Sequence, residues 1–330
     1  MKYRKLGTTE IEVSTVCLGC WSLIGDDTWG DQAESDSVAA IHSALDAGVN
    51  FFDTAEGYGR GESERLLGKV LSDRRKDVII ATKVSRRNLA PDALKDACEG
   101  SLRRLGTDVI DLYQVHWPRP DVPLAETLGA MEELKAAGKV RAIGVSNFGK
   151  SYLTELLEVG HVESNQLCYS LLWRAIEHEV QPICVESGIG MLCYSPLAQG
   201  LLTGKFASAD DVPETRARTR LFSKSRPHAR HDAPGCEDAV FAAIAELRSV
   251  CESIGKPMGQ LALAWLLAQE GVTSVIVGAR NPQQAAQNAG AAEVELCAEA
   301  LRQLSRATEP VKQHIGVNAD MWQSDSRMER

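Results

Sequence analysis

One pattern recurs along the chain and restricts its fold more than any other feature. A segment with helical spacing ends at a glycine, a short polar step follows, and a run of apolar residues begins. The glycines in these positions are Gly48, Gly106, Gly138, Gly188 and Gly271. A glycine just past a helix end adopts the left-handed cap conformation that other residues resist. We therefore expect helices and strands to alternate, which is typical of a parallel sheet.

The apolar runs predict eight strands, near residues 16–19, 50–54, 78–83, 110–116, 140–146, 162–167, 190–195 and 274–278. Helical stretches follow them, among them residues 61–71, 150–159 and 176–187. Because the runs are continuously apolar, both faces of each strand are expected to be buried. Eight such units favour a closed (β/α)8 TIM barrel, the α/β fold that we predict.

An open, doubly wound sheet is the alternative arrangement of such units. That fold would lead us to expect a Gly-x-Gly-x-x-Gly turn after an early strand. The nearest match, Gly57 to Gly61, has its third glycine one position early and follows an aspartate rather than a hydrophobic strand end. We interpret this segment as a flexible loop, which leaves the barrel as the preferred fold.

Several segments lie outside the repeat. They are an N-terminal β-hairpin cap at 2–13, a long polar loop after strand seven at 203–235, two helices at 237–253 and 257–269, and a final helix at 297–311. The length of 330 residues would permit two domains, but (β/α)8 barrels often reach about 250 residues or more. No Pro- or Ser-rich linker divides the chain, so we predict a single domain over residues 1–330.

The charge balance excludes some partners. The chain has 36 Lys and Arg residues against 45 Asp and Glu residues, a formal net charge of −9. An acidic protein is a poor partner for nucleic acid or for an anionic membrane. The longest uncharged stretch, Ser187 to Gly204, contains Pro196 and Gln199, so we expect no membrane span.

The cysteines indicate a reducing compartment. There are nine, an odd number with irregular spacing, and Met1 leads into a polar stretch rather than into a signal peptide. We therefore predict a cytoplasmic protein with free thiols. Cys17 and Cys20 have the spacing of a redox or zinc motif. No second pair completes a zinc set, so we predict that both thiols are structural and that no metal is bound.

Polar residues stand where the predicted strands end. They are Asp53, Lys83, His116, Ser146, Asn147, Asn165, Gln166 and Tyr194, and Tyr58 follows strand two in a glycine-flanked loop. Barrel active sites lie at the C-terminal ends of the strands. We therefore expect these side chains to converge at one mouth of the barrel.

Four of these residues form a coherent acid–base set. Tyrosine has a pKa of about 10, and a nearby lysine ammonium is expected to lower that value by about 1–3 units. Tyr58 beside Lys83 could then give and take a proton. Asp53 would keep the buried Lys83 charged, and His116 would orient a carbonyl oxygen.

The chain resembles the aldo-keto reductase superfamily from end to end. The matching stretches are GVNFFDTAEGYGRGESERLLGKVL, VIIATKV, SLRRLGTDVIDLYQVHWP, GKVRAIGVSNF, YSPLAQGLLTGKF and SVIVGARNPQQAAQN. The resemblance implies a (β/α)8 barrel that reversibly reduces aldehydes or ketones with a nicotinamide cofactor, usually NADPH. The family's catalytic tetrad falls on Asp53, Tyr58, Lys83 and His116, with the tyrosine as general acid. The stretch YSPLAQGLLTGK and the long loop resemble the bacterial and potassium-channel-β-like branches of the family more than the aldose reductase branch.

The resemblance also implies a cofactor site. Ser146, Asn147 and Gln166 would hold the nicotinamide carboxamide, with Asp53 nearby, and Tyr194 would stack on the nicotinamide ring. The residues expected along the pyrophosphate are Ser195, Leu197, Gln199, Gly200 and Lys205. Those expected around the adenosine are Gly278, Arg280, Gln284, Gln287 and Asn288.

Arg280 suits a 2′-phosphate because a guanidinium can bind it through two hydrogen bonds. NADPH is therefore the expected cofactor, with NADH as the less favoured alternative. The substrate pocket is expected to contain Trp21, Tyr58, His116 and Trp117, and Trp21 would flank the nicotinamide or the substrate.

A basic run lies in the long loop. It consists of Arg216, Arg218, Arg220, Lys224, Arg226, Arg230 and His231, with no acid among them. Such a run is usually a solvated surface. We favour the hypothesis that Arg218 or Arg220 reaches the cofactor phosphates. His228 and His231 have no third ligand nearby, so we do not expect a metal there.

The sequence predicts an NADPH-dependent oxidoreductase that acts on a small carbonyl compound. The alternative is an NADPH-binding regulatory or redox-sensing subunit with little turnover; because the sequence starts directly at the predicted hairpin, we rank this second. A barrel isomerase or hydrolase without nicotinamide is a third option. The tryptophans of the mouth loops, Trp21, Trp29 and Trp117, make an aromatic or apolar aldehyde or a sugar plausible. The oligomeric state is left open.

Overall fold

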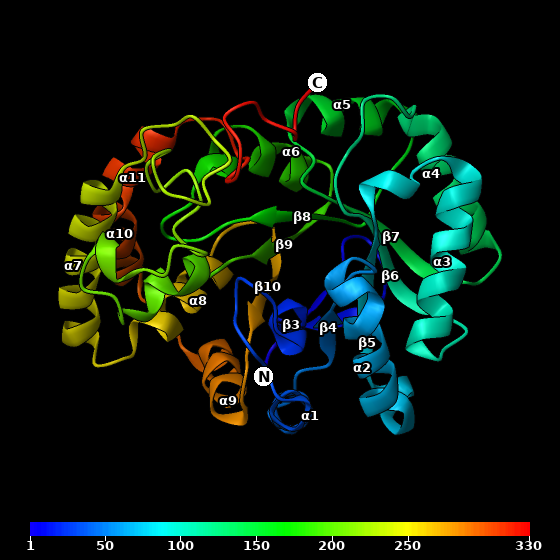
Figure 1. The fold of residues 1–330 in the computed structure, drawn as a ribbon, viewed down its shortest axis with the longest axis horizontal. Helices are drawn as coiled ribbons and strands as arrows, with labels where there is room; N and C mark the ends of the chain where they lie inside the picture. The colour runs from blue at the N-terminus through cyan, green and yellow to red at the C-terminus, as the bar shows by residue number, and fades with distance from the viewer.

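The computed structural model describes residues 1–330, and eight parallel strands close into a barrel at its centre (Figure 1). The barrel strands are β3 (Val16–Gly19), β4 (Phe51–Asp53), β5 (Ile79–Val84), β6 (Ile110–Val115), β7 (Val140–Ser146), β8 (Ser164–Cys168), β9 (Gly190–Tyr194) and β10 (Val272–Gly278). They follow one another around the barrel in chain order, and β10 pairs with β3 to close it. The predicted TIM barrel is confirmed.

Side chains fill the inside of the barrel. Phe51, Ala81, Leu112 and Leu192 are fully buried and form one compact cluster there. The hairpin of β1 (Tyr3–Lys5) and β2 (Glu12–Ser14) adds buried Leu6, Ile11 and Val13 to the same cluster. The hairpin therefore closes one end of the barrel, as predicted, and leaves the other end open for a site.

A ring of helices packs against the outside of the barrel through a much larger apolar cluster. The helices are α1 (Glu34–Asp46), α2 (Glu62–Leu71), α3 (Pro91–Leu105), α4 (Leu124–Ala136), α5 (Lys150–Val159), α6 (Val180–Glu186), α7 (Glu237–Ile254), α8 (Met258–Leu267), α9 (Pro282–Ala289), α10 (Ala298–Ala307) and α11 (Glu309–Ile315). The five glycines predicted to end helices all have positive φ. No helix is long and apolar enough to cross a lipid bilayer.

Two predictions about local structure need correction. The predicted final helix at 297–311 is two helices, α10 and α11, which meet at Thr308. Pro310 lacks the backbone N–H that a continuous helix would need there. The helix predicted at 176–187 begins as a 3-10 turn at Ala175–His178 and becomes α-helical only at Val180. The segment predicted as a loop, Gly57 to Gly61, has left-handed backbone at Gly59 and Arg60, each with φ of 56°, so it is not a regular helix.

The strand register brings the polar strand ends to one level. Lys83 at the end of β5 lies opposite Gln114 of β6, and Ser146 at the end of β7 lies opposite Gln166 of β8. Asp53 is the last residue of β4. Because all eight strands are parallel, these side chains share the end of the barrel that the hairpin leaves open.

Candidate active site

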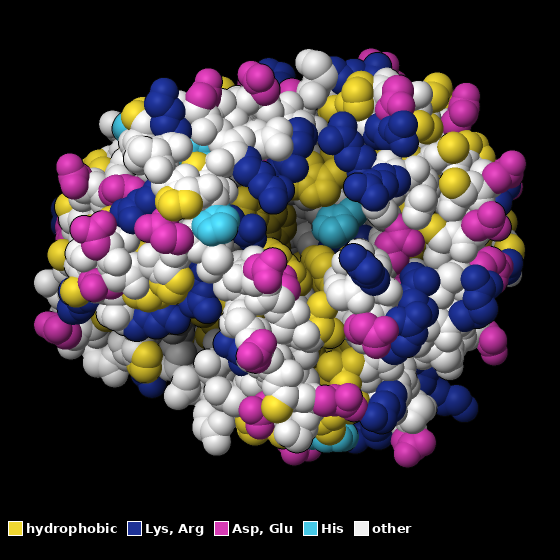
Figure 2. Space-filling view, viewed as in Figure 1, with side chains coloured by type: hydrophobic (Ala, Val, Ile, Leu, Met, Phe, Trp, Pro, Cys, Tyr) yellow, Lys and Arg dark blue, Asp and Glu magenta, His cyan; other side chains and the backbone are white.

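A cavity of about 1080 Å³ lies at the C-terminal ends of the barrel strands. The residues predicted to be catalytic or to contact the cofactor or substrate line this cavity, except Arg220 and Lys83, and Lys83 is fully buried behind Tyr58. The strand-end residue Asn165 does not line it either, and its side chain donates to the Phe148 carbonyl. Figure 2 shows Lys and Arg side chains gathered around the hollow at the centre of this face. A cavity of this size can hold a cofactor together with a small substrate.

Lys83 links the buried acid to the tyrosine. Its ammonium donates to Asp53 Oδ1 at 2.6 Å, to the Thr54 carbonyl at 2.8 Å and to the Tyr58 hydroxyl at 3.3 Å. Lys83 and Asp53 are almost completely buried. The three bonds satisfy all three protons of the ammonium, so a charged lysine is held at a fixed distance from the Tyr58 oxygen.

The pKa of Tyr58 differs from the sequence-based prediction. Burial raises the pKa of the phenol, and the Lys83 charge offsets that effect only in part, so the net direction is upward. For Lys83, burial lowers the pKa, but Asp53 and Tyr58 together outweigh burial and raise it. Tyr58 is therefore a protonated hydrogen-bond donor at neutral pH rather than a phenol close to ionisation.

His116 is neutral at physiological pH. Burial, reinforced by the Lys83 charge, lowers the pKa of its imidazole to about 3. Its ring meets the Tyr58 ring edge-on, with centroids 5.8 Å apart. A neutral imidazole beside the Tyr58 phenol can donate or accept a hydrogen bond at the same oxygen atom without adding charge to the site.

We expect His116 to make the folded state sensitive to acid. The pKa of His116 is about 3 in the folded state, below the ordinary value of 6.5. Below pH 6.5 the imidazole is therefore protonated in the unfolded chain but stays neutral in the folded one. Stability is then lost as pH falls from 6.5, by about 2 kcal/mol at pH 5. Urea unfolding of wild type and His116→Gln at pH 7 and pH 5 measures this: the variant should lose less stability. An exposed control, His42→Gln, should lose as much as wild type, and equal losses in all three proteins would contradict the argument.

Amide side chains surround the other oxygen of Asp53. Gln166 Nε2 donates to Asp53 Oδ2 at 2.8 Å, and Gln114 Nε2 lies 3.4 Å from the same atom. Ser146 Oγ donates to the Gln166 carbonyl. Gln114 was not predicted from the sequence. It lies on β6, two residues before His116, so the alternation of a strand places both side chains on the same inward face.

Asn147 and Tyr194 complete this wall. Asn147 has a φ of 63°, and its Nδ2 donates to the His116 carbonyl at 3.0 Å. The Tyr194 hydroxyl donates to Asn147 Oδ1 at 2.9 Å. Both polar atoms of the Asn147 side chain therefore already bond to protein groups. A ligand that contacts this amide would share Nδ2 or Oδ1 with one of these protein bonds.

Aromatic rings line the part of the cavity around Tyr58. The Trp21 ring stacks on the Tyr58 ring at 6.1 Å and 20°, and Trp29 meets Trp21 edge-on at 5.5 Å. The Trp21 indole N–H donates to Asp26 at 2.7 Å, which holds the ring in place. These rings keep the space next to the Tyr58 hydroxyl apolar on one side.

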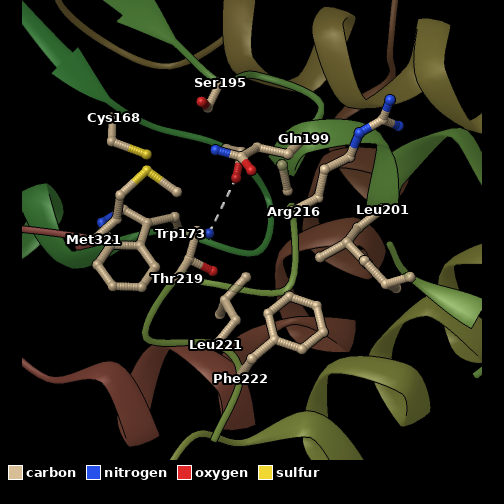
Figure 3. A pocket seen from close by; sticks show the side chains of 13 residues that line it. Cys168, Trp173, Ser195, Gln199, Leu201, Arg216, Thr219, Leu221, Phe222 and Met321 are labelled. Atoms are coloured by element: carbon tan, nitrogen blue, oxygen red, sulfur yellow. Dashed lines mark hydrogen bonds between the residues drawn. The ribbon is translucent and has the colours of Figure 1, made fainter. Parts of the chain in front are cut away.

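The backbone after β9 is strained. Ser195, Ala198 and Gln199 all have φ between 46° and 55°, a region that non-glycine residues seldom occupy. Gln199 reaches into a small cavity of about 10 Å³ beneath this turn, next to Ser195 and Arg216 (Figure 3). Neither its amide oxygen nor its nitrogen has a protein partner. Strain of this kind persists where the surrounding structure enforces it and is common at ligand sites.

Three cations gather beyond this turn. The positive charges of Arg216 and Arg280 add to burial in lowering the pKa of Lys205, and Arg280 adds to burial in lowering that of Arg216. Arg280 is bonded to the neutral Gln32 side chain and the Asp31 carbonyl. None of the three forms an ion pair with a carboxylate, so their charges are free to attract an anion.

Arg218 and Arg220, one of which was predicted to contact the cofactor phosphates, lie in different places. Arg218 lines the cavity. Arg220 does not: it donates to the carbonyls of Asn318 and Asp320 and stacks on Trp173. The prediction that Arg220 contacts the cofactor phosphates is therefore wrong, because its guanidinium binds the C-terminal segment instead.

That C-terminal segment, residues 316–330, is the largest part of the site that the sequence analysis missed. Trp322, Gln323 and Arg327 from this segment line the cavity. Buried Asp320 binds Arg327 through two bonds of 2.8 and 2.9 Å, and Arg327 stacks on Trp117 at 3.9 Å. A tryptophan in an otherwise polar terminal stretch is the signal that could have indicated this packing.

All nine cysteines are free, and Cys17 and Cys20 are completely buried. Burial raises the pKa of both thiols. No group of three or more His, Cys, Asp or Glu side chains is placed to hold a metal ion.

A (β/α)8 barrel whose mouth joins an Asp–Lys–Tyr–His set to a cation-lined groove defines a barrel oxidoreductase. The chain belongs to the aldo/keto reductase family, whose model matches residues 15–309. It is thus an NAD(P)H-dependent oxidoreductase, in agreement with the sequence analysis.

Individual relatives cover almost the whole chain. The NADH-specific methylglyoxal reductase of Escherichia coli is 33% identical over 94% of this chain and 100% of its own length. The crystal structure of a Klebsiella pneumoniae aldo-keto reductase in complex with NADPH is 31% identical, with a TM-score of 0.74 over 92% of this chain and 94% of that chain. The glycerol dehydrogenase of Gluconobacter oxydans is 29% identical, with a TM-score of 0.80 over 93% of this chain and 95% of that chain. These bacterial relatives are consistent with the bacterial branch that the sequence indicates.

Proposed function

We propose that this protein reduces a small aldehyde or ketone to the alcohol with NADPH, with Tyr58 as the general acid. The observation that carries the proposal is the Lys83 ammonium, which contacts both Asp53 and the Tyr58 hydroxyl, at 2.6 and 3.3 Å. A protonated phenol held by a buried cation is suited to deliver a proton to an oxygen that is gaining negative charge.

The residues present fit a nicotinamide dinucleotide. Lys205, Arg216 and Arg280 form an anion site without carboxylate partners, which suits the pyrophosphate and a 2′-phosphate. Helix α9 begins beside Arg280 and is capped by Asn281, whose side chain accepts from the Gln284 amide. Relatives use either cofactor, since the Escherichia coli relative is named NADH-specific and the Klebsiella pneumoniae structure is a complex with NADPH. We propose NADPH because three unpaired cations exceed what the pyrophosphate alone requires.

The residues expected around each part of the cofactor are those named from the sequence. Ser146, Asn147, Gln166 and Tyr194 would hold and cover the nicotinamide, with Asp53 nearby. Ser195, Leu197, Gln199, Gly200 and Lys205 would follow the pyrophosphate. Gly278, Arg280, Gln284, Gln287 and Asn288 would surround the adenosine.

Each chain residue then has one task. When bound, the reduced nicotinamide supplies the hydride that the carbonyl carbon accepts. Tyr58 donates a hydrogen bond to the carbonyl oxygen and passes its proton to that oxygen as negative charge develops. Lys83 stabilises the resulting phenolate, Asp53 keeps Lys83 charged, and neutral His116 orients the carbonyl from the other side. Trp21 and Trp117 exclude water from one side of the reaction site.

A turnover assay tests this function directly. We expect purified protein to oxidise NADPH in the presence of neutral aldehydes such as butanal and benzaldehyde, over many turnovers per protein molecule. NADH should give a lower kcat/KM. A single slow turnover with every aldehyde would instead favour the regulatory or redox-sensing alternative.

The compartment and the boundaries follow as further parts of this proposal. The free thiols of all nine cysteines fit a reducing cytoplasm. We propose that residues 1–330 act as one domain, since the terminal segment packs on the same barrel mouth that the strands build.

A further inference from the structure

The cavity wall carries far more positive than negative charge. Its cations are Lys205, Arg216, Arg218, Arg230, Arg280 and Arg327, and Asp53 is its one carboxylate. Asp53 is already neutralised by Lys83. In a protein with a net charge of −9, a cavity of this polarity is built to receive anions.

The cofactor phosphates account for only part of this charge. Lys205, Arg216 and Arg280 perturb one another and form the anion site described above. Arg327 is paired with Asp320. Arg218 and Arg230 remain, and the charge of Arg230 is the main electrostatic influence on Arg218. The pyrophosphate and 2′-phosphate of NADPH together carry about four negative charges, so about one of these two cations is left for another anion, and their positions decide which.

Arg218 lies at the catalytic end of the cavity. Its guanidinium carbon is 5.0 Å from the centre of the Trp322 ring and 6.0 Å from that of Trp21. The Trp21 ring is in turn stacked on Tyr58, with centroids 6.1 Å apart. One aromatic ring therefore separates Arg218 from the phenol that would protonate the substrate.

Arg218 has no protein partner for its charge. It forms neither an ion pair nor a hydrogen bond, and its Nε is buried without a partner. The one acid that acts electrostatically on Arg218 is Asp26. Both oxygens of Asp26 already accept hydrogen bonds, one from the Trp21 indole and the other from the backbone amides of Thr28 and Trp29. The two aromatic faces hold the planar guanidinium in position while its N–H groups stay available.

We propose that Arg218 binds an anionic group of the substrate. The preferred substrates are then aldehydes or ketones that carry a carboxylate or a phosphate a few carbon atoms from the carbonyl. The guanidinium binds the anion through two parallel hydrogen bonds, which places the carbonyl at Tyr58. This proposal rests on the carbonyl reductase function proposed above, and it moves Arg218 from the cofactor phosphates to the substrate.

Matched substrate pairs test it. We would measure kcat/KM for succinic semialdehyde against butanal, and for glyceraldehyde phosphate against glyceraldehyde, in wild type, Arg218→Gln and Arg218→Lys. Wild type should prefer at least one anionic member. Arg218→Gln should lose that preference by about tenfold to a hundredfold, mainly through KM, because it removes a charged hydrogen bond. Arg218→Lys should keep part of the preference for the anionic substrate. The substrate pair whose preference changes shows whether the bound group is a carboxylate or a phosphate.

Cofactor binding provides the control. The Kd of NADPH, from quenching of protein fluorescence, should be unchanged in Arg218→Gln and raised in Arg216→Gln, and Arg216→Gln should keep the preference for the anionic substrate. An equal preference in wild type and Arg218→Gln, or a rise in NADPH Kd in Arg218→Gln like that in Arg216→Gln, would overturn the assignment. If wild type reduces the neutral aldehydes without preferring an anionic one, this inference fails and the proposed function stands. If it reduces none of the four, the proposed function fails as well.

Discussion

Tyr58→Phe is expected to lower the rate of carbonyl reduction by about a hundredfold to ten-thousandfold, the range that a positioned general acid contributes. The substitution removes the hydroxyl that Lys83 contacts at 3.3 Å but keeps the ring that stacks on Trp21. The shape of the cavity is therefore preserved, and NADPH should bind with an unchanged Kd. Steady-state kinetics and a fluorescence titration measure the two quantities.

The matched control is Tyr113→Phe. Tyr113 is a buried barrel tyrosine whose hydroxyl has no partner, so the same chemical change there should leave the rate unaltered. Full activity in Tyr58→Phe would show that another group protonates the carbonyl oxygen.

Lys83→Met is expected to abolish reduction and to destabilise the fold by about 3–5 kcal/mol, the usual cost of leaving one partner of a buried ion pair alone. Asp53 is almost fully buried and loses its 2.6 Å partner. Urea unfolding gives the stability, and NADPH oxidation with butanal gives the activity.

A double variant separates the two effects. Asp53→Asn combined with Lys83→Met removes the uncompensated charge, so stability should return toward wild type while activity stays lost. Lys69→Met is the control, since its ion pair with Glu34 is exposed and should contribute less than about 1 kcal/mol. If the double variant is no more stable than Lys83→Met, then buried charge is not the cause of the loss.

Much of the barrel could be predicted from the sequence. The predicted strands agree with the observed ones to within two residues, because helix-ending glycines such as Gly48 and Gly138 and continuous apolar runs are local signals. The errors concern features that local patterns do not encode. The helix predicted over 297–311 has the right periodicity, but the missing backbone donor of Pro310 divides it.

Most of the predicted site residues converge on the cavity wall, and Lys83, Asn165 and Arg220 are the exceptions. What could not be predicted is which basic residues of the long loop face the cavity. Arg216, Arg218 and Arg220 are evenly spaced in a segment without regular structure, so no periodicity assigns them a side. The packing of residues 316–330 determines which of these arginines faces the cavity, because Arg220 donates hydrogen bonds to carbonyls of that segment.

Local sequence patterns were enough to predict the order of the elements, the parallel barrel and the candidate catalytic residues Asp53, Tyr58, Lys83 and His116. These follow from residue type and spacing along the chain. The charge state of the site depends instead on the three-dimensional packing, which raises the pKa of Tyr58 and lowers that of His116 to about 3. The physical reason is desolvation, because the cost of burying a charge depends on what surrounds the group in three dimensions.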